Sequence, residues 1–293
     1  MRSLQLARFV ALAGCPRPKP QVDPPKDAAS KVDDGVTEYD RDEDAFEAVL
    51  KEDPAVLAVG EAHAPRGATA ASSAKRFTGE LLPLLAGRAS DLLVELMMPP
   101  KGCVKEAKQA RETQKPVTSQ QAETNQNEYV LMGDAARKLG IVPDLLRPSC
   151  EDLAAINDAG PTAMVETSLE TIARLTTAQA TKMIARAGRK MIVTYGGALH
   201  NDATPPPERA AWAFGPALSQ AVDASAGGGT SQARTRGRYV ELDLYVPDFI
   251  TGDELWTKQP WYAKWAAHAA SGKAVLVRLA PRSYVLVLSK KAA

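Results

Sequence analysis

Four short apolar runs in the first two-thirds of the chain constrain its fold more than any other feature. They are Ala55–Gly60 (AVLAVG), Asp91–Met98 (DLLVELMM), Ile141–Leu146 (IVPDLL) and Lys190–Gly197 (KMIVTYGG). Each run is nearly continuous in apolar residues, which is typical of a strand that a parallel sheet buries on both faces. Pro143 weakens the prediction for the third run, because proline cannot donate to the hydrogen-bond ladder of a sheet.

Segments with helical patterns separate or follow these runs. They are Ala45–Lys51, Ser72–Ala86, Asn127–Leu139, Thr162–Ala187 and Pro207–Ala221. Strands that alternate with helices predict an α/β fold, with a mixed, mostly parallel sheet flanked by helices. Residues 274–279 and 284–289 flank Pro281-Arg282 and predict a C-terminal antiparallel hairpin at the edge of that sheet. We expect residues 43–293 to form a single α/β domain.

The chain opens with a short basic and apolar segment that ends in the tetrapeptide LAGC at residues 12–15. This tetrapeptide resembles the lipobox of bacterial lipoproteins, and the resemblance implies a signal over residues 1–15 with lipidation of the Cys15 thiol. We therefore expect an N-terminal lipid anchor in a membrane of the bacterial cell envelope, on the periplasmic or outer-membrane face. Because the apolar stretch after Arg8 is shorter than the usual core of a signal peptide, a disordered tail is the alternative.

Residues 16–42 predict a proline-rich tether between this anchor and the folded body. The prolines at its start are Pro16, Pro18, Pro20, Pro24 and Pro25. Proline lacks an N–H donor and fixes φ, so this composition favours extended, unpaired chain. No apolar periodicity that could build a core comes before Phe46.

Charge and hydropathy exclude two classes of protein. Lys and Arg total 36 and Asp and Glu total 35, so the formal net charge is +1. A protein that binds polyanions by bulk charge usually shows a basic excess, so we expect no nucleic acid partner. No run of the sequence approaches the roughly 18 apolar residues that a membrane-spanning helix needs.

Two features between the second and third apolar runs allow more than one interpretation. The polar stretch 101–127 is either a lid over a site or a solvated helical excursion. Cys103 and Cys150 follow the second and third runs, so their thiols approach each other if both strands end at one edge of the sheet. An oxidising compartment would favour a disulfide between them, and two free thiols are the alternative.

Two of the three histidines lie in matched contexts. One begins at the last residue of the first apolar run, as Gly60-Glu61-Ala62-His63, and the other at the last residue of the fourth, as Gly197-Ala198-Leu199-His200. Both are therefore G-x-x-H motifs at the carboxyl end of a predicted strand. In an open α/β sheet, ligands bind in the crevice outside those strand ends.

Glu95 adds a carboxylate to the same edge of the predicted sheet. It lies inside the second apolar run, where burial is costly unless a metal or an imidazolium pairs with it. We therefore expect Glu61, His63, Glu95 and His200 to form one site. The alternative is that Glu61 and His63 are ordinary loop residues and that Glu95 pairs with an arginine.

The segments VLAVGEAH, LLVELMMP and IVTYGGALH together resemble the ChaN-like, TraB/Tiki-like and erythromycin-esterase-like superfamily. The resemblance covers roughly residues 45–205. Its ChaN-like branch is associated with binding of haem or iron, often in lipoproteins, and its Tiki-like branch resembles metal-dependent proteases. Its esterase-like branch uses a Glu/His pair to activate water.

The resemblance implies a hydrolase of ester or peptide bonds, with or without a metal, whose catalytic residues are Glu61, His63, Glu95 and His200. The same four side chains would be the ligands of a divalent ion, for which zinc, manganese or cobalt are suitable. The alternative is a non-catalytic protein that binds haem or a metal in the same crevice. The expected ligand is thus a small molecule, a peptide or haem.

Other side chains near these motifs have two interpretations each. Arg147 ends the third run and is either an anion clamp or a salt-bridge partner of Glu95. Tyr195 either donates to an oxyanion or packs within its strand. Arg66 follows His63 closely enough to reach the site, and Asp202 either orients an imidazole or is a solvated loop acid.

Four aromatic residues lie close together near the C-terminus: Trp256, Trp261, Tyr262 and Trp265. One interpretation is an aromatic platform for a sugar, a porphyrin or a lipid headgroup. The other is that these rings pack a C-terminal helix onto the sheet.

Overall fold

The computed structural model of the 293-residue chain describes residues 35–188, 190–227 and 238–291. The predicted lipoprotein signal, with Cys15, and the first part of the predicted tether lie outside the described residues. Within the described part of the chain, no helix is both long enough and apolar enough to cross a membrane.

An eight-stranded sheet runs through the described residues in the order β1-β7-β8-β6-β2-β5-β3-β4. Its strands are β1 (Val36–Tyr39), β2 (Pro54–Glu61), β3 (Ala89–Met97), β4 (Val142–Leu146), β5 (Met191–Gly197), β6 (Arg238–Tyr245), β7 (Ala274–Ala280) and β8 (Ser283–Val287). All neighbours from β8 to β4 pair in parallel, whereas β1 with β7 and β7 with β8 pair antiparallel. The predicted fold class, a mixed and mostly parallel α/β sheet with a C-terminal antiparallel hairpin, is therefore confirmed.

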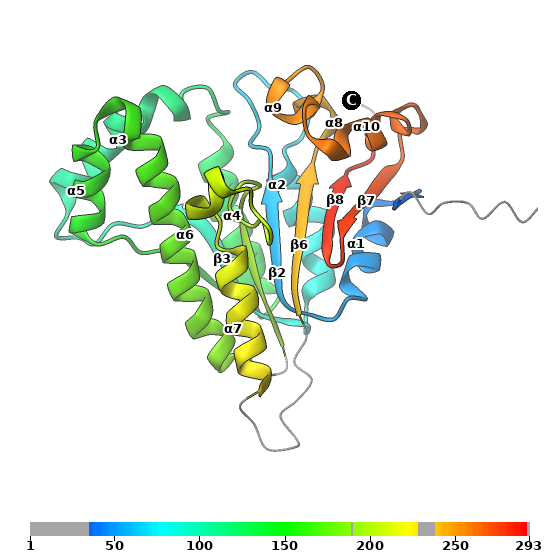
Figure 1. The fold of residues 1–293 in the computed structure, drawn as a ribbon, viewed down its shortest axis with the longest axis horizontal. Coiled ribbons are helices and arrows are strands. Elements are labelled where there is room, and N and C mark those ends of the chain that lie inside the picture. The colour runs from blue at the N-terminus through cyan, green and yellow to red at the C-terminus, as the bar shows by residue number, and fades with distance from the viewer. Residues whose placement is uncertain (1–34, 189, 228–237, 292–293) are drawn as a thin grey trace, which may run out of the picture. The chain divides into compact units, whose positions relative to one another are not determined.

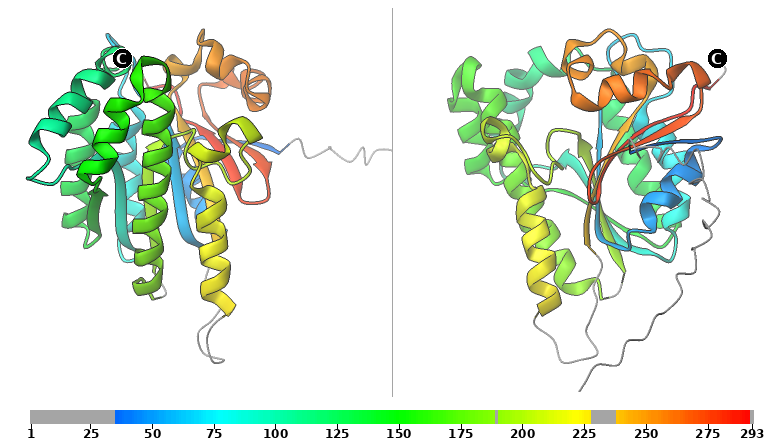
Figure 2. Two further views of the ribbon diagram at one scale, coloured as in Figure 1. Left: turned by 60° about the vertical axis from the view of Figure 1, so that its left-hand side comes forward. Right: turned by 45° about the vertical axis from the view of Figure 1, so that its right-hand side comes forward.

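Helices cover both faces of the sheet (Figure 1 and Figure 2). One face carries α1 (Asp42–Leu50), α2 (Ser73–Arg76) and α4 (Asn125–Lys138), and the other carries α6 (Gly160–Arg186) and α7 (Gly215–Gly227). The remaining helices are α3 (Val104–Thr118), α5 (Cys150–Asp158), α8 (Pro247–Ile250), α9 (Glu254–Thr257) and α10 (Pro260–Ala266). A π-helical turn, Phe77–Leu81, continues α2, and short 3-10 turns span Leu82–Leu85, Pro207–Trp212 and Ala269–Ser271.

Strand β2 explains why its sequence reads as a continuous apolar run. All of its residues are buried, because the strand is central and both faces are covered. Leu57 and Val59 join the core beneath α1 and α4, while Val56 and Ala58 join the core beneath α6 and α7. Successive side chains of a strand point to opposite faces, so each core receives every second residue.

The structure differs from the sequence prediction in two places. Residues 36–39 lie within the predicted tether, yet they form β1 and pair with β7, so the folded body begins at Gly35 and not near residue 43. Helix α5 was not expected. The predicted third strand is present as β4 at the edge of the sheet, where a proline such as Pro143 is tolerated.

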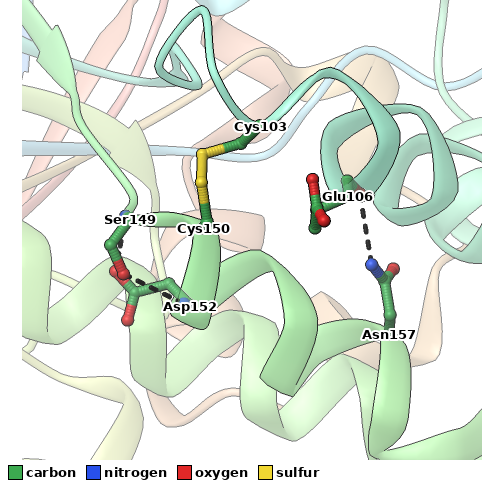
Figure 3. The surroundings of a disulfide bond; sticks show 6 residues. All are labelled: Cys103, Glu106, Ser149, Cys150, Asp152 and Asn157. Atoms are coloured by element: carbon green, nitrogen blue, oxygen red, sulfur yellow. Dashed lines mark hydrogen bonds between the residues drawn. A yellow bond between two sulfur atoms is a disulfide. The ribbon is translucent and has the colours of Figure 1, made fainter.

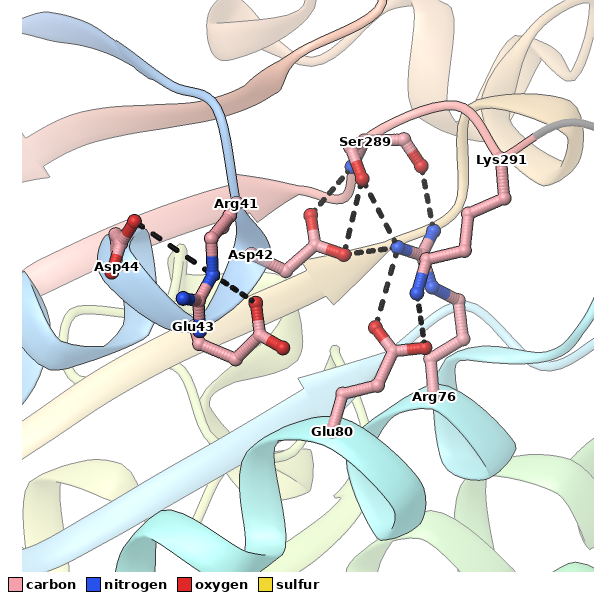
Figure 4. A network of polar contacts seen from close by, with 8 residues as sticks. All are labelled: Arg41, Asp42, Glu43, Asp44, Arg76, Glu80, Ser289 and Lys291. Carbon is pink, nitrogen blue, oxygen red and sulfur yellow. Dashed lines mark hydrogen bonds and ion pairs between the residues drawn. The ribbon is translucent and has the colours of Figure 1, made fainter.

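A buried ion pair ties the start of the fold to its end (Figure 4). The Asp42 carboxylate, at the first turn of α1, pairs with the Arg76 guanidinium of α2, and both side chains are buried. The Ser289 backbone N–H, just beyond β8, donates to Asp42 Oδ1 at 2.7 Å. Burial raises the pKa of the Asp42 carboxyl, while the Ser289 N–H and the Arg76 charge oppose that rise.

A disulfide joins Cys103, just before α3, to Cys150, the first residue of α5 (Figure 3). The two Cα atoms are 5.2 Å apart. Asn157 Nδ2 of α5 also donates to the Glu106 carbonyl oxygen of α3 at 3.1 Å. The pairing of the two cysteines, left open by the sequence, is thus present in the structure, and it fastens the polar excursion to the body of the fold.

Replacing both cysteines, Cys103→Ala with Cys150→Ala, is expected to destabilise the protein by about 2–4 kcal/mol, since the bond closes a loop of 47 residues and restricts the unfolded chain. Urea unfolding with and without a thiol reductant measures this effect. The reductant should lower the midpoint of the wild type and leave the double variant unchanged. Equal midpoints for the reduced and oxidised wild type would contradict the prediction.

Candidate functional site

The two G-x-x-H loops lie next to each other at the carboxyl edge of the sheet. Strands β2 and β5 pair in parallel, with Gly60 opposite Gly196 and Glu61 opposite Gly197. The Ala198 N–H donates to the Glu61 carbonyl oxygen at 3.0 Å, so the pairing of the two chains extends beyond the end of β5. The structure therefore brings the two histidine motifs to one place.

Glu61 and Glu95, however, lie on opposite faces of the sheet. Glu61 continues the alternation of Leu57 and Val59 and faces the α4 side, whereas Glu95 continues that of Leu93 and faces the α6 side. The predicted carboxylates thus do not share a face. Any site that uses both must lie across the strand ends.

The Glu61 carboxylate is 3% exposed and accepts hydrogen bonds from three side chains. Tyr129 of α4 donates to Oε1 at 2.7 Å, and Tyr195 of β5 donates to Oε2 at 2.6 Å. Burial, together with the Glu61 charge, raises the pKa of both tyrosines well above the ordinary value, so both remain donors at neutral pH. The third partner is His63.

His63 Nδ1 lies 3.0 Å from Glu61 Oε1, and 28% of the His63 side chain is exposed. Since a carboxylate only accepts, the imidazole donates through Nδ1–H and directs Nε2 outward. Burial alone would lower the pKa of His63, but the hydrogen bond and charge of Glu61, with the charge of Glu95, raise it above the ordinary value. Glu61 therefore orients His63 and favours its protonated form.

Glu95 and His200 form the second half of the site. The Gly197 backbone N–H donates to Glu95 Oε2 at 2.9 Å, and His200 Nε2 lies 3.7 Å from Glu95 Oε1. His200 is buried, and its Nδ1 lies 2.8 Å from the Trp212 carbonyl oxygen. Because a carbonyl oxygen only accepts, Nδ1 carries the proton and Nε2 faces the Glu95 carboxylate.

Both halves converge above Gly197. A Cβ atom on that glycine would lie 3.5 Å from His63 Nε2, 3.5 Å from His200 Cδ2 and 3.9 Å from Glu95 Oε2. At the neighbouring Gly196, an added Cβ would lie only 2.7 Å from the Glu95 Cβ, so no larger residue fits there. The glycine pair thus lets the Glu95 carboxylate lie across β5 and reach the two histidines.

The donors at this point suit a divalent metal ion in their chemistry. Both histidines have Nδ1 engaged, by Glu61 or by the Trp212 carbonyl, which leaves the two Nε2 atoms as potential ligands. Glu95 would be the third ligand, since Glu61 already accepts three hydrogen bonds. In the part of the chain that the structure describes, no three such side chains are gathered closely enough to hold an ion, so binding would require them to move together.

A small cavity lies beside Glu95 on the α6 side of the sheet. Its volume is about 10 Å³, and Glu95, Thr176 and Thr194 are among the residues that line it. Within the described residues, the buried Thr194 hydroxyl oxygen has no hydrogen-bond partner. A cavity of this size has room for about one water molecule, which would bridge the Thr194 hydroxyl and the Glu95 carboxylate.

Of the four other predicted side chains, the structure brings Tyr195 to the site and leaves the other three outside it. Tyr195 donates to Glu61. Arg147 pairs with Asp144 at 2.8 Å, so it is not the partner of Glu95. Arg66 is exposed, and Asp202 accepts from a backbone N–H within its own loop at 3.0 Å.

The aromatic residues near the C-terminus pack against one another and against β6. Trp256, Trp261 and Trp265 are each less than a tenth exposed. Tyr245 of β6 stacks on Trp261 with ring centroids 4.8 Å apart, and Tyr262 packs edge-on against Trp265. The interpretation that these rings fasten the C-terminal helices to the sheet agrees with this packing.

The polar stretch 101–127 contains α3 and ends beside the His63 loop. The Arg66 N–H donates to the Gln120 carbonyl oxygen at 2.8 Å, and the Ala122 N–H donates to the Ala64 carbonyl oxygen at 2.8 Å. Asn125 Nδ2 also donates to the Ala64 carbonyl oxygen at 3.1 Å. These bonds attach the segment to the residues that follow His63, so it borders the site.

Sequence reasoning missed three residues. Tyr129 lies in a predicted helix, where its helical spacing from other apolar residues was the one indication that it faces the sheet. Glu241 and Asp243 alternate with apolar residues on β6, a pattern that signalled a strand whose acids face one side. Burial, with the charge of a neighbouring carboxylate, raises the pKa of Glu241 to about 8, and burial raises that of Asp243 to about 7.

Comparisons with protein-family models, with curated proteins and with solved structures find no match to this chain. The superfamily resemblance of the three motif segments therefore remains a prediction.

Replacing Glu61 with glutamine is expected to lower the pKa of His63. The amide removes the negative charge that raises this pKa, while the burial that lowers it remains. A histidine-resolved NMR titration measures the change. Glu38→Gln is the matched control, since Glu38 pairs with His268 and lies on the edge strand β1, whereas His63 follows the central strand β2. An unchanged His63 midpoint in Glu61→Gln would contradict the prediction.

The stability of the protein is expected to fall as the pH rises from about 4 to 6. Over this range the folded state keeps Glu241 and Asp243 protonated while the unfolded state releases those protons, so the free energy of unfolding decreases with pH, by on the order of 1 kcal/mol per unit for each such carboxyl. Glu241→Gln should reduce this slope in urea unfolding. Glu254→Gln, at an exposed position, should leave it unchanged, and an equal slope in both variants would contradict the assignment.

Proposed function

We propose that this protein is a hydrolase of ester or peptide bonds that activates water at the carboxyl edge of β2, β3 and β5. The observation that carries the proposal is the convergence of His63, His200 and Glu95 above Gly197. Each histidine is held there through its Nδ1 by a separate acceptor, so that His63 Nε2 and the Cδ2 edge of the His200 ring border the same space.

His63 is the general base in this proposal. Its Nε2 takes the proton of water, and Glu61 stabilises the imidazolium that forms, as a carboxylate does for the histidine of a catalytic triad. The raised pKa of His63 supports this role, because it makes the imidazole a stronger base for that proton. Tyr129 and Tyr195 hold Glu61 in place and are positioning residues.

Glu95 and His200 form the opposite wall of the proposed site. Glu95 and Thr194 border the small cavity on the α6 side of the sheet, which would hold one water molecule beside the Glu95 carboxylate. If the active form contains a divalent ion such as zinc, manganese or cobalt, then His63, His200 and Glu95 would hold it, and the ion would acidify a bound water. The metal-free route needs only the His63 and Glu61 pair.

The proposed location is the bacterial cell envelope, with Cys15 as the lipid attachment point. The disulfide between Cys103 and Cys150 supports this proposal, because disulfides persist in oxidising compartments outside the cytoplasm. A site at a membrane surface is compatible with small esters or peptides as substrates.

Substituting His63→Ala is expected to lower the hydrolysis of p-nitrophenyl acetate or of a fluorogenic peptide mixture by about 100-fold or more, because the general base is lost. Gly197→Ala tests the site without removing a functional group. Its methyl group would stand at ordinary contact distance from His63, His200 and Glu95, so we expect activity to fall while the unfolding midpoint changes little.

Gly79→Ala is the matched control, because a Cβ at Gly79 meets no atom within 4 Å. Full activity in both His63→Ala and Gly197→Ala would overturn the proposal. Elemental analysis with a chelator distinguishes the metal-dependent route from the metal-free one. A Soret band on haem titration that disappears in His63→Ala, without any hydrolysis, would favour the haem-binding alternative.

A further inference from the structure

A second cavity, of about 330 Å³, lies beside the loop that carries His200. Ala198, Leu199 and Asp202 of that loop line it, together with Glu241 and Asp243 of β6. In Figure 1, β6 ends beneath α8, α9 and α10, and the residues from α9 to α10 provide another wall. The volume is at the lower end of the range for small-molecule sites.

Two buried carboxyl groups form the polar side of this cavity. Glu241 is 5% exposed and Asp243 is 8% exposed. The Ala203 N–H donates to Glu241 Oε2 at 2.8 Å, and Asn201 Nδ2 donates to Asp243 Oδ1 at 2.9 Å. Burial raises the pKa of both carboxyls, and the Arg209 charge only partly offsets that rise at Asp243. The charged form of a buried carboxyl is costly, and a bound cation would offset that cost.

Aromatic rings form the apolar part of the lining. Trp256 and Trp261 line the cavity, and so does Tyr245, whose ring contacts both tryptophans with centroid distances of 4.9 and 4.8 Å. Aromatic rings attract organic cations through their negative faces, and carboxylates add a full charge. The same rings have little to offer a strongly hydrated metal ion.

We propose that this cavity binds a small monovalent organic cation, with its ammonium group beside Glu241 and Asp243 and its carbon groups against Trp256 and Trp261. Arg209 and Lys264 also line the cavity, and their positive charges exclude ligands with several cationic groups. The site goes beyond the proposed hydrolase, which uses His63, Glu61 and Glu95 and none of the residues of this cavity.

Choline and its neutral carbon isostere, 3,3-dimethylbutan-1-ol, are matched probes of this proposal. Both have the same shape, so a difference in affinity reports the charge alone. Isothermal titration calorimetry at pH 9, above the pKa of both carboxyls, should give binding of choline that is at least tenfold tighter than binding of the alcohol. Quenching of tryptophan fluorescence gives a second readout at Trp256 and Trp261.

Glu241→Gln is expected to weaken the binding of choline at least tenfold, and Asp243→Asn should have the same effect. Asp248→Asn is the control, because Asp248 is an exposed acid near the end of the same segment and does not line the cavity. Thermal unfolding of each variant checks that the fold is intact, and either single variant that folds is sufficient for the test.

Three results would overturn the proposal. They are equal affinity for choline and the alcohol, no choline binding at millimolar concentration, and undiminished binding in a folded Glu241→Gln or Asp243→Asn variant. Ester hydrolysis is measured separately in the same variants. Loss of choline binding with hydrolysis retained, or the reverse in His63→Ala, distinguishes the failure of one site from the failure of the other.

Discussion

The buried carboxylate of Glu61 is the constraint on which the rest of the site depends. A carboxylate that is 3% exposed at the end of a central strand must have donors around it. It accepts a hydrogen bond from Tyr129 of α4, one from Tyr195 of β5 and one from His63 of its own loop. A single charge therefore fixes how α4 packs on the sheet and which nitrogen of His63 faces outward.

At Gly60 and Gly196, glycine has a different role from the one that a turn would require. A Cβ on Gly60 would lie 2.6 Å from the Ala198 Cα and 2.6 Å from Asn201 Oδ1. Gly60 therefore allows the second histidine loop to cross directly over β2, and Gly196 allows Glu95 to cross β5. Neither residue has the positive φ that makes glycine necessary in a tight turn. Close approach of neighbouring segments is what these positions need.

The sequence predicted the strands and the shared edge of the two motifs, because continuous apolar runs and parallel pairing leave few alternatives. It did not predict that Glu61 and Glu95 face opposite sides, although strand alternation contains that information. The register between β3 and β5 decides it, and register is set by packing across the sheet. Tyr129 could not be assigned, since a helix of mixed polarity does not reveal which residue faces a buried charge. β1 was missed because four residues beside a proline-rich segment carry too little periodicity to stand out.

The loop between β5 and α7 connects the two candidate sites through neighbouring residues. His200 contacts Glu95 and the Trp212 carbonyl, whereas Asn201 donates to Asp243 and to the Ala58 carbonyl oxygen. Adjacent residues share a peptide plane, so their backbones cannot move independently. A ligand that displaced Asp243 would therefore disturb its hydrogen bond with Asn201. Asn201 borders the acidic cavity through this bond, and His200 belongs to the histidine site, so the two sites meet at consecutive residues of one loop.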